Sequence, residues 1–370
     1  MTYFPDADAG WERIAPADAS MDATKLADAV AFVESHEVSW PRDIHRDGAI
    51  PSLTDLEPPP WNELLGPIEP RGGPNGLILK GGRIVASWGD PARSDMTFSV
   101  AKSYLSLLAG LAVADGLIGD IDAPVGATVA TTELSAPRNG AVTWRHFLTQ
   151  TSEWEGTLFG KPDLVDRNRQ VGPGSDNSRK GQHRDLAAPG SYWEYNDVRV
   201  NMLALALLHV FKRPLPEVLA ERIMAPIGAS DTWTWHGYHN SFVEIDGRTL
   251  QSVPGGTHWG GGMHINSFDH ARVGLLVLNG GRWRDRALLP ATWIDQLRAP
   301  STVRPGYGFL WWLNTDRAEW PAASPAAFAA SGAGGNIIWL DPDHDLVVVA
   351  RWMAEGTTAD FLGRVTAAAG

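Results

Sequence analysis

A long apolar helix constrains the fold of this chain more than any other feature. Residues 99–118, SVAKSYLSLLAGLAVADGLI, are the most strongly apolar stretch with helical character, and we expect this helix to end at Gly116 or Gly119. A second stretch, VRVNMLALALLHVF at residues 198–211, is apolar around nearly its whole circumference. Such helices belong inside a protein. A chain of 370 residues, 44% of them hydrophobic, can bury both in one large domain or in two closely packed lobes.

Strand patterns lie on both sides of these helices along the chain. Residues 76–89 predict a hairpin around a Gly-Gly turn, and GYGFLWWLN, GNIIWLDP and LVVVARWM predict strands in the last third. Further helices are predicted at residues 22–36, with Asp22 as N-cap, at 145–150, and in DHARVGLLVLNGG and PATWIDQLRAP. We expect residues 1–370 to form a single domain, with a discontinuous α/β lobe of about 1–100 and 250–370 and a helical lobe of about 100–250.

Two long connections complete this outline. Residues 40–74 contain many Pro and Gly residues and predict an ordered surface connection. Residues 155–190 are polar and rich in Gly, Asp, Arg and Asn. Because loops of this length inside compact domains often cover a functional site, we expect residues 155–190 to form such a cover.

Composition narrows the classes of partner. The net charge of −12, from 43 acidic and 31 basic residues, disfavours nucleic acid and anionic membranes, which would repel the chain. A small substrate is easier to accommodate. The absence of Cys removes cysteine nucleophiles, disulfides and thiolate metal sites. The acidic start MTYFPDADAG has no apolar run of the signal-peptide type, and no later stretch reaches bilayer length, so we expect a cytoplasmic protein. The sequence indicates no oligomeric state.

The first chemical signal is a serine and a lysine three residues apart, Ser99 and Lys102, at the start of the first apolar helix. This spacing places both side chains on one face, so the lysine can reach the hydroxyl. A desolvated lysine can remove the proton that makes serine a poor nucleophile, and a helix N-terminus offers free N–H groups to an oxyanion. The structural alternative is that Ser99 is an N-cap and Lys102 lies on a solvated edge.

Two further motifs follow along the chain. Tyr195 lies in PGSYWEYND, residues 189–197, just before the second apolar helix, where it could act as a general base beside an ammonium group or could simply pack. Residues 329–336, AASGAGGN, precede the predicted strand IIWLDP. Small residues there allow a ligand to approach the backbone closely, although a glycine-rich turn before a core strand explains them equally well.

In this order and spacing, the three motifs resemble those of the serine β-lactamase-related family, especially its class C β-lactamase, D-alanyl-D-alanine peptidase, family VIII esterase and 6-aminohexanoate-dimer hydrolase branches. The S-x-x-K motif matches Ser99 and Lys102, Y-x-N aligns with residues 195–197, and K-T-G or H-x-G aligns with residues 330–332. The resemblance spans about residues 75–352. It implies an α/β (α+β) fold of the β-lactamase and penicillin-binding-protein type, with an antiparallel sheet flanked by helices plus a helical lobe.

The resemblance also implies roles for single residues. Ser99 would be acylated, Lys102 and Tyr195 would shuttle its proton, and the backbone amides of Ser99 and Ala333 would bind the oxyanion. Two positions depart from the family pattern. Asp197 replaces Asn and favours a charged Lys102, which makes Tyr195 the better proton acceptor. Ala330 stands where the family carries Lys or His, which removes the cation expected to hold a substrate carboxylate.

Other residues are candidates for substrate binding. His258 and Trp259 lie in the glycine-rich segment 255–262, where the histidine could line the acyl pocket, replace the missing basic residue or only bind a loop backbone. Some of the 17 tryptophans, including Trp311 and Trp312, could build an aromatic pocket, although most belong in the core. The substrate-binding candidates are Asp197, His258, Trp259, Ser331, Gly332, Trp154 and Trp193.

Competing chemistries lack their motifs. No G-x-S-x-G of an α/β-hydrolase and no H-E-x-x-H of a zinc hydrolase occurs, and His236 and His239 have ligand spacing but no evident third ligand. We expect a serine hydrolase that acts through an acyl-enzyme on a small ester or amide, without metal or organic cofactor. A β-lactamase or D-amino-acid peptidase is the first alternative, and a non-catalytic ligand-binding member of the fold is the second.

Overall fold

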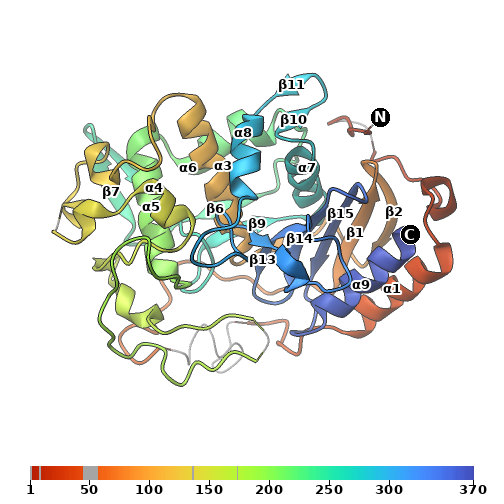
Figure 1. Cartoon of the computed structure of the whole chain (residues 1–370), viewed down its shortest axis with the longest axis horizontal. Coiled ribbons are helices and arrows are strands. Elements are labelled where there is room, and N and C mark those ends of the chain that lie inside the picture. Colours follow the sequence, from red (N-terminus) through yellow and green to blue (C-terminus); the bar gives the residue numbers. More distant parts are fainter. Residues whose placement is uncertain (1, 8–9, 45–56, 136, 173) are drawn as a thin grey trace.

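The computed structural model describes residues 2–7, 10–44, 57–135, 137–172 and 174–370. Its main sheet is antiparallel, with strand order β12-β13-β14-β15-β1-β2 (Figure 1). The strands of this sheet are β1 (Asn75–Lys80), β2 (Arg83–Trp88), β12 (Trp312–Leu313), β13 (Phe328–Gly332), β14 (Asn336–Asp341) and β15 (Leu346–Arg351). Because β1 pairs with β15, segments from opposite ends of the chain are neighbours in one sheet, as the strand patterns predict.

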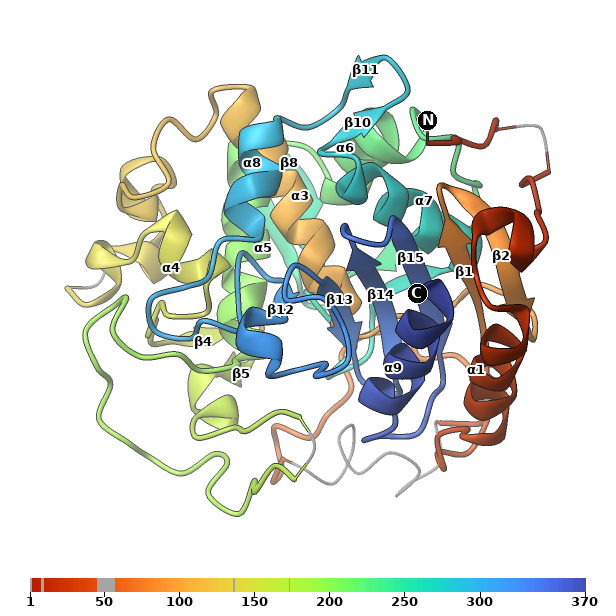
Figure 2. The same ribbon diagram turned by 45° about the vertical axis from the view of Figure 1, so that its right-hand side comes forward.

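The period-two alternation of strand side chains divides the main sheet between two cores. On β14, Ile338 and Leu340 face the larger core, whereas Ile337 and Trp339 face the smaller one. Helices α1 (Ala23–Ser35) and α9 (Thr358–Ala369) cover the face of the sheet that borders the smaller core. They lie in front of the sheet in Figure 2. Asp22 caps α1 by accepting from the amides of Thr24 and Lys25, which confirms the predicted start of that helix. Helix α9 lies beyond the predicted elements.

The opposite face of the sheet carries the apolar helices. Helix α3 (Val100–Ala114) is buried along almost its whole length and packs against α5 (Asp197–Phe211) and β13, which confirms the first prediction of the sequence. Helix α7 (Ser267–Leu278) crosses β1, β14 and β15 on the same face. The other α-helices in the described part of the chain are α4 (Trp144–Leu148), α6 (Leu215–Leu219) and α8 (Ala291–Leu297).

Within the residues that the structure describes, short strands form four smaller antiparallel sheets. One has three strands in the order β3-β9-β6, and the others are the hairpins β4-β5, β7-β8 and β10-β11. Their bounds are β3 (Asp95–Met96), β4 (Thr157–Leu158), β5 (Lys161–Pro162), β6 (Thr234–His236), β7 (Phe242–Ile245), β8 (Arg248–Gln251), β9 (Gly262–Ile265), β10 (Arg282–Trp283) and β11 (Arg286–Ala287).

Two sequence expectations need qualification. The segment GYGFLWWLN forms a strand only at Trp312–Leu313, because the chain turns sharply before it: the Gly308 amide donates to Trp311 O and Leu310 has a φ of 61°. The connection at 40–74 has no helix or strand in its described residues 40–44 and 57–74, and its residues 45–56 lie outside the described part. The division into two lobes stays a prediction. The mixed α/β class, with antiparallel sheets flanked by helices, is confirmed.

Among the described residues, no helix combines the length and apolar character required to cross a bilayer.

Candidate active site

Ser99 is the N-cap residue of α3, and Lys102 lies one turn further along the helix. Lys102 Nζ donates a hydrogen bond to Ser99 Oγ at 2.8 Å, and it lies 3.3 Å from Gly255 O. The residue before the serine, Phe98, has a φ of 49°, a strained conformation for a bulky side chain that is commonest at functional sites. Ser99 is half-buried, whereas Lys102 is 1% exposed. The short S-x-x-K spacing therefore produces the side-chain contact expected from it.

Asp197, the first residue of α5, pairs with the Lys102 ammonium, and the two side chains are 6% and 1% exposed. Burial alone would lower the pKa of Lys102, but the Asp197 carboxylate and the neighbouring Tyr195 raise it above its ordinary value. Burial alone would raise the pKa of Asp197, yet Lys102 and Arg169 hold that pKa well below its usual range. The pair is therefore an ammonium and a carboxylate, and Lys102 acts on Ser99 as a hydrogen-bond donor.

Tyr195 precedes α5 and is 4% exposed. The centroid of its ring lies 4.9 Å from Lys102 Nζ and 5.3 Å from the guanidinium carbon of Arg169. Trp312 stacks on the same ring with a centroid separation of 5.9 Å. Two cations and one aromatic plane thus surround the tyrosine, and the cations create a positive field at its side chain.

The end of β13 lies against the beginning of α3. A Cβ atom on Gly332 would lie 2.5 Å from Thr97 O and 2.9 Å from the Ser99 amide nitrogen, so only glycine allows this approach. Ser331 and Gly332 are half-buried, and Ala333 is exposed at the turn between β13 and β14. Ala330 is fully buried. The glycine-rich motif therefore borders Ser99, and no cationic side chain comes from position 330.

His258 joins this group from the glycine-rich segment 255–262. Its Nδ1 lies 2.9 Å from Asp197 Oδ2 and its Nε2 lies 2.8 Å from Glu57 Oε1. Trp259 stacks on the imidazole with a centroid separation of 4.1 Å and an interplanar angle of 7°. The structure thus brings His258 to Asp197 rather than to a loop backbone, and Trp259 contacts the histidine from a fully buried position.

The long polar segment 155–190 also reaches the site, through residues that the sequence motifs did not identify. Arg169 donates to Asp197 Oδ2 at 2.7 Å and lies 3.3 Å from Asp166 Oδ1. Lys180 contacts Glu57 and lies 3.3 Å from Asp166 Oδ1. A basic residue in a loop gives no sequence signal of its partner, because its carboxylates come from distant segments. Their only advance sign is the concentration of charged residues in a loop expected to cover a site.

One group of described residues could offer ligand atoms to a metal ion. The ligand atoms of Glu57, Asp166 and His258 lie within 4.8 Å of one another. The ammonium of Lys180 already contacts Glu57 and lies near Asp166, and its side chain is 4% exposed. Because the Lys180 ammonium already pairs with both carboxylates, this group fits a salt-bridge network better than a metal site.

The tryptophan candidates Trp193 and Trp154 lie in different environments. Trp193 is half-buried and packs against Tyr307 and Trp312, with ring centroids 5.6 Å and 6.3 Å away. The guanidinium of Arg304 lies 4.3 Å from the Trp193 ring. Trp154, by contrast, is fully buried in the main core and its indole donates to Glu133 O. We call Trp193, Tyr195, Tyr307 and Trp312 the aromatic wall.

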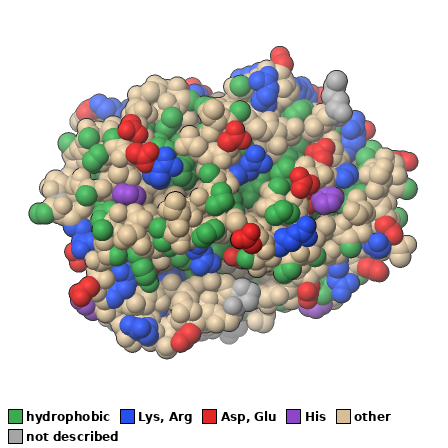
Figure 3. All heavy atoms as spheres, in the orientation of Figure 1, with side chains coloured by type: hydrophobic (Ala, Val, Ile, Leu, Met, Phe, Trp, Pro, Cys, Tyr) green, Lys and Arg blue, Asp and Glu red, His purple; other side chains and the backbone are tan. Residues whose placement is uncertain are grey.

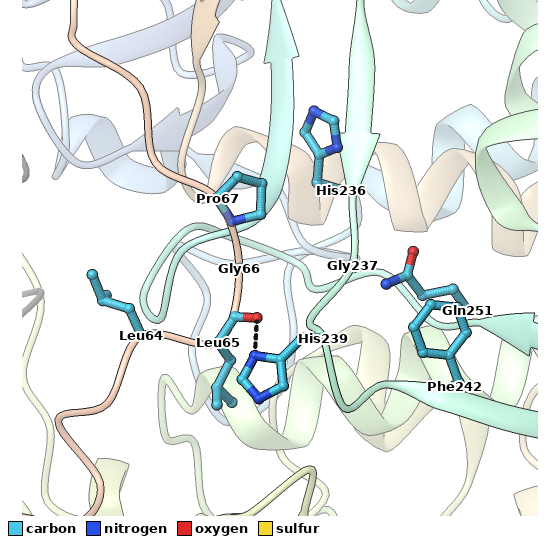
Figure 4. A pocket seen from close by; sticks show the side chains of 9 residues that line it. All are labelled: Leu64, Leu65, Gly66, Pro67, His236, Gly237, His239, Phe242 and Gln251. Carbon is cyan, nitrogen blue, oxygen red and sulfur yellow. Dashed lines mark hydrogen bonds between the residues drawn. The ribbon is translucent and has the colours of Figure 1, made fainter.

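A separate groove of about 560 Å³ is lined by Leu64, Leu65, Gly66, Pro67, His236, Gly237, His239, Phe242 and Gln251 (Figure 4). In it, His239 Nδ1 lies 2.9 Å from Leu65 O and the His236 ring is directed away from His239. The two histidines with ligand spacing therefore do not converge. The surface in Figure 3 mixes acidic, basic and apolar side chains.

Comparison with known proteins identifies the family of this chain. A family model described as Beta-lactamase matches residues 77–369. A curated protein of Escherichia coli O157:H7 named "Putative D-alanyl-D-alanine carboxypeptidase" is 24% identical over 195 residues, which cover 44% of this chain and 45% of that protein. The chain thus aligns with less than half the length of the curated relatives it matches.

Solved structures show the same fold at low identity. The structure named "Putative 6-aminohexanoate-dimer hydrolase from Bacillus anthracis" has a TM-score of 0.59 and 16% identity, covering 98% of this chain and 87% of that chain. EstCE1, described as a hydrolase with promiscuous acyltransferase activity, has a TM-score of 0.58 and 17% identity, covering 94% of this chain and 99% of its own. Because the family model matches most of the sequence, the chain belongs to the beta-lactamase family of serine hydrolases.

Proposed function

We propose that the protein is a serine hydrolase that forms an acyl-enzyme on Ser99 from a small ester or amide. The observation that supports this most is the hydrogen bond from Lys102 Nζ to Ser99 Oγ at the start of α3, with Gly332 packed against the Ser99 amide. A serine serving only as a helix cap would need neither contact. The proposed reaction involves no cofactor, nucleic acid or membrane.

Acylation uses Tyr195 as the proton acceptor, because Asp197 keeps Lys102 protonated. The ammonium donates to Ser99 Oγ and leaves the hydroxyl proton free to move to the Tyr195 oxygen in its anionic form. Oγ then bonds to the substrate carbonyl carbon, and the amides of Ser99 and Ala333 receive the oxyanion. Tyr195 returns the proton to the leaving alcohol or amine as the carbonyl carbon releases it.

Deacylation repeats these steps with water. A water molecule gives its proton to Tyr195 and bonds to the acyl carbon, and Ser99 Oγ leaves and regains a proton. The product is a carboxylic acid. The buried cations Lys102 and Arg169, both over the Tyr195 ring, stabilise the negative charge at each stage.

The substrate is proposed to be an ester or amide without the carboxylate that penicillin-like compounds present. Ala330 supplies no cation at the position where the family motif places one. Trp193 and Trp312, the half-buried members of the aromatic wall, offer apolar and planar surface to an acyl or leaving group instead. EstCE1 is described as a hydrolase with acyltransferase activity, which is consistent with an acyl-enzyme in a protein of this fold.

The test is intact-protein mass after incubation with a fluorophosphonate and, separately, turnover of a short p-nitrophenyl ester. Wild type should gain one adduct and hydrolyse the ester, and Ser99→Ala should lose both. Ser106→Ala is the matched control, because Ser106 lies on the same helix and is fully buried. It should keep both. A folded wild type without adduct would favour the non-catalytic, ligand-binding alternative, and turnover by Ser99→Ala would exclude Ser99 as the nucleophile.

A further inference from the structure

His258 has a carboxylate at each ring nitrogen. Nδ1 makes a hydrogen bond with Asp197 Oδ2 at 2.9 Å, whereas Nε2 lies 2.8 Å from Glu57 Oε1 as a charge contact without hydrogen-bond alignment. The His258 side chain is 7% exposed, and the two carboxyl groups are 6% and 3% exposed. A neutral imidazole has a proton on only one nitrogen and would direct the lone pair of the other at a carboxylate. The two carboxylates beside the buried ring therefore favour the positively charged imidazolium, which has protons on both nitrogens.

Contacts continue from this imidazolium to the serine. Asp197 Oδ2 meets His258, Asp197 Oδ1 meets Lys102, and Lys102 Nζ donates to Ser99 Oγ at 2.8 Å. Each link joins two groups from different turns or segments of the chain. A buried chain of contacts thus runs from Glu57 through His258 and Asp197 to the Lys102 ammonium beside the proposed nucleophile.

The groups around His258 support its charge. The buried carboxylate of Asp166 lies near His258. It also forms ion pairs with Arg169 and Lys180. Trp259 stacks on the ring, and Lys161 lies on the Trp259 indole, 5.4 Å from its centroid. Burial alone would lower the pKa of His258, but Asp166, Asp197 and Glu57 raise it above its ordinary value.

A protonated His258 gives this cluster one more positive charge than its carboxylates carry. Its carboxylates belong to Glu57, Asp166 and Asp197, and its cations are Lys102, Arg169, Lys180 and protonated His258. The excess positive charge is matched when Tyr195 is anionic or when an oxyanion forms. With a neutral His258, three cations would balance three carboxylates, and this excess positive charge would be absent.

We propose that His258, held by Glu57, is a positioning residue that in its doubly protonated form orients Asp197 and so holds Lys102 against Ser99. This proposal rests on the function proposed above. It adds a histidine and a glutamate to the site, and neither belongs to the three motifs that align with the family.

The first test is the pH dependence of kcat/KM for the p-nitrophenyl ester in wild type, His258→Gln and Glu57→Gln. His258→Gln should lower kcat by about tenfold or more, with a small change in KM, because it disturbs the ammonium and not the substrate surface. Wild-type activity should fall as pH rises through the His258 titration. This fall in activity at rising pH should be absent in His258→Gln. In Glu57→Gln it should occur at lower pH, because the imidazolium has lost one of its counter-ions.

His183→Gln is the matched control, because this histidine is exposed in the segment 155–190. It should leave rate and pH profile unchanged. A purely structural role for His258 would lower the unfolding midpoint without removing the fall in activity at rising pH. Circular dichroism establishes that each variant is folded, and Glu57→Gln, which conserves shape, tests the same pH dependence if His258→Gln does not fold.

The second test reads the proton positions without activity. Long-range ¹H–¹⁵N spectra of the full chain, assigned by comparison with His258→Gln or by selective labelling, should show both His258 nitrogens protonated at neutral pH. A neutral imidazole there, or an unchanged kcat and pH profile in folded His258→Gln, would overturn the proposal. Failure of the proposed function is distinguishable, because wild type would then lack the fluorophosphonate adduct even if His258 is an imidazolium.

Discussion

Asp197 and Lys102 form an ion pair inside the protein, at side-chain exposures of 6% and 1%. In the Y-x-N motif that this segment resembles, an uncharged Asn occupies the Asp197 position. The carboxylate compensates the charges of Lys102, Arg169 and His258 at once. The carboxylate raises the pKa of Lys102 and favours its ammonium form, so in the proposed reaction the proton from Ser99 goes to another group.

Asp197→Asn should destabilise the protein, because three buried cations lose a shared counter-ion. Removing one partner of a buried ion pair costs about 3 to 5 kcal/mol, and we expect a loss in this range in the free energy of unfolding by urea. Asp122→Asn is the control, because Asp122 pairs with Arg145 at exposures of 58% and 40%. The control should cost less than about 1 kcal/mol. Equal losses in both variants would contradict the ion-pair assignment.

Gly332→Ala should impair acylation. The new Cβ would lie 2.5 Å from Thr97 O and 2.9 Å from the Ser99 nitrogen, and both atoms belong to the backbone, so β13 must move away from α3. Loss of one oxyanion donor lowers rates by on the order of a hundredfold or more, and we expect that decrease in the rate of fluorophosphonate labelling. Gly119→Ala, where the new Cβ meets nothing within 4 Å, should label at the wild-type rate. If Gly332→Ala is labelled at the wild-type rate, the position of β13 does not affect acylation.

Trp312→Ala should weaken the binding of substrates with large apolar groups. Trp312 stacks on Tyr195 and packs against Trp193, so its removal opens the aromatic wall. We expect KM for an aromatic acyl ester to rise by about tenfold, and KM for an acetyl ester to change much less. Trp233→Ala, at another half-buried tryptophan, is the control. The same KM change for both esters would contradict a role in acyl-group selection.

His264 should make the protein sensitive to acid. Burial lowers its pKa from 6.5 to about 4, so between these values the unfolded chain binds a proton that the folded chain does not. The free energy of unfolding should therefore fall as pH decreases through this window, by roughly 3 kcal/mol in all for this group. Urea unfolding across the window should show a shallower pH dependence in His264→Gln than in wild type. Parallel curves for the two proteins would disprove this contribution.

Much of the fold follows from patterns that depend on near neighbours in the chain. Burial of α3 and α5 follows from apolar residues around the whole helix, and the start of α1 follows from the capping carboxylate of Asp22. The β1-β2 hairpin follows from two apolar runs around Gly81 and Gly82. These features depend on residues that are close together in the sequence, which explains why the sequence alone predicts them.

The site divides in the same way. The contact of Ser99 with Lys102 follows from helix spacing, so it can be predicted from the sequence alone. The contacts of Asp197 with His258 and Arg169, and of His258 with Glu57, join four segments that meet only in the folded chain, so they could not be read from the sequence. Charge attraction acts through space, and no local sequence period records which carboxylate a distant cation will meet. Trp154 and Trp193 likewise look alike in sequence, and only packing separates the core residue from the wall residue.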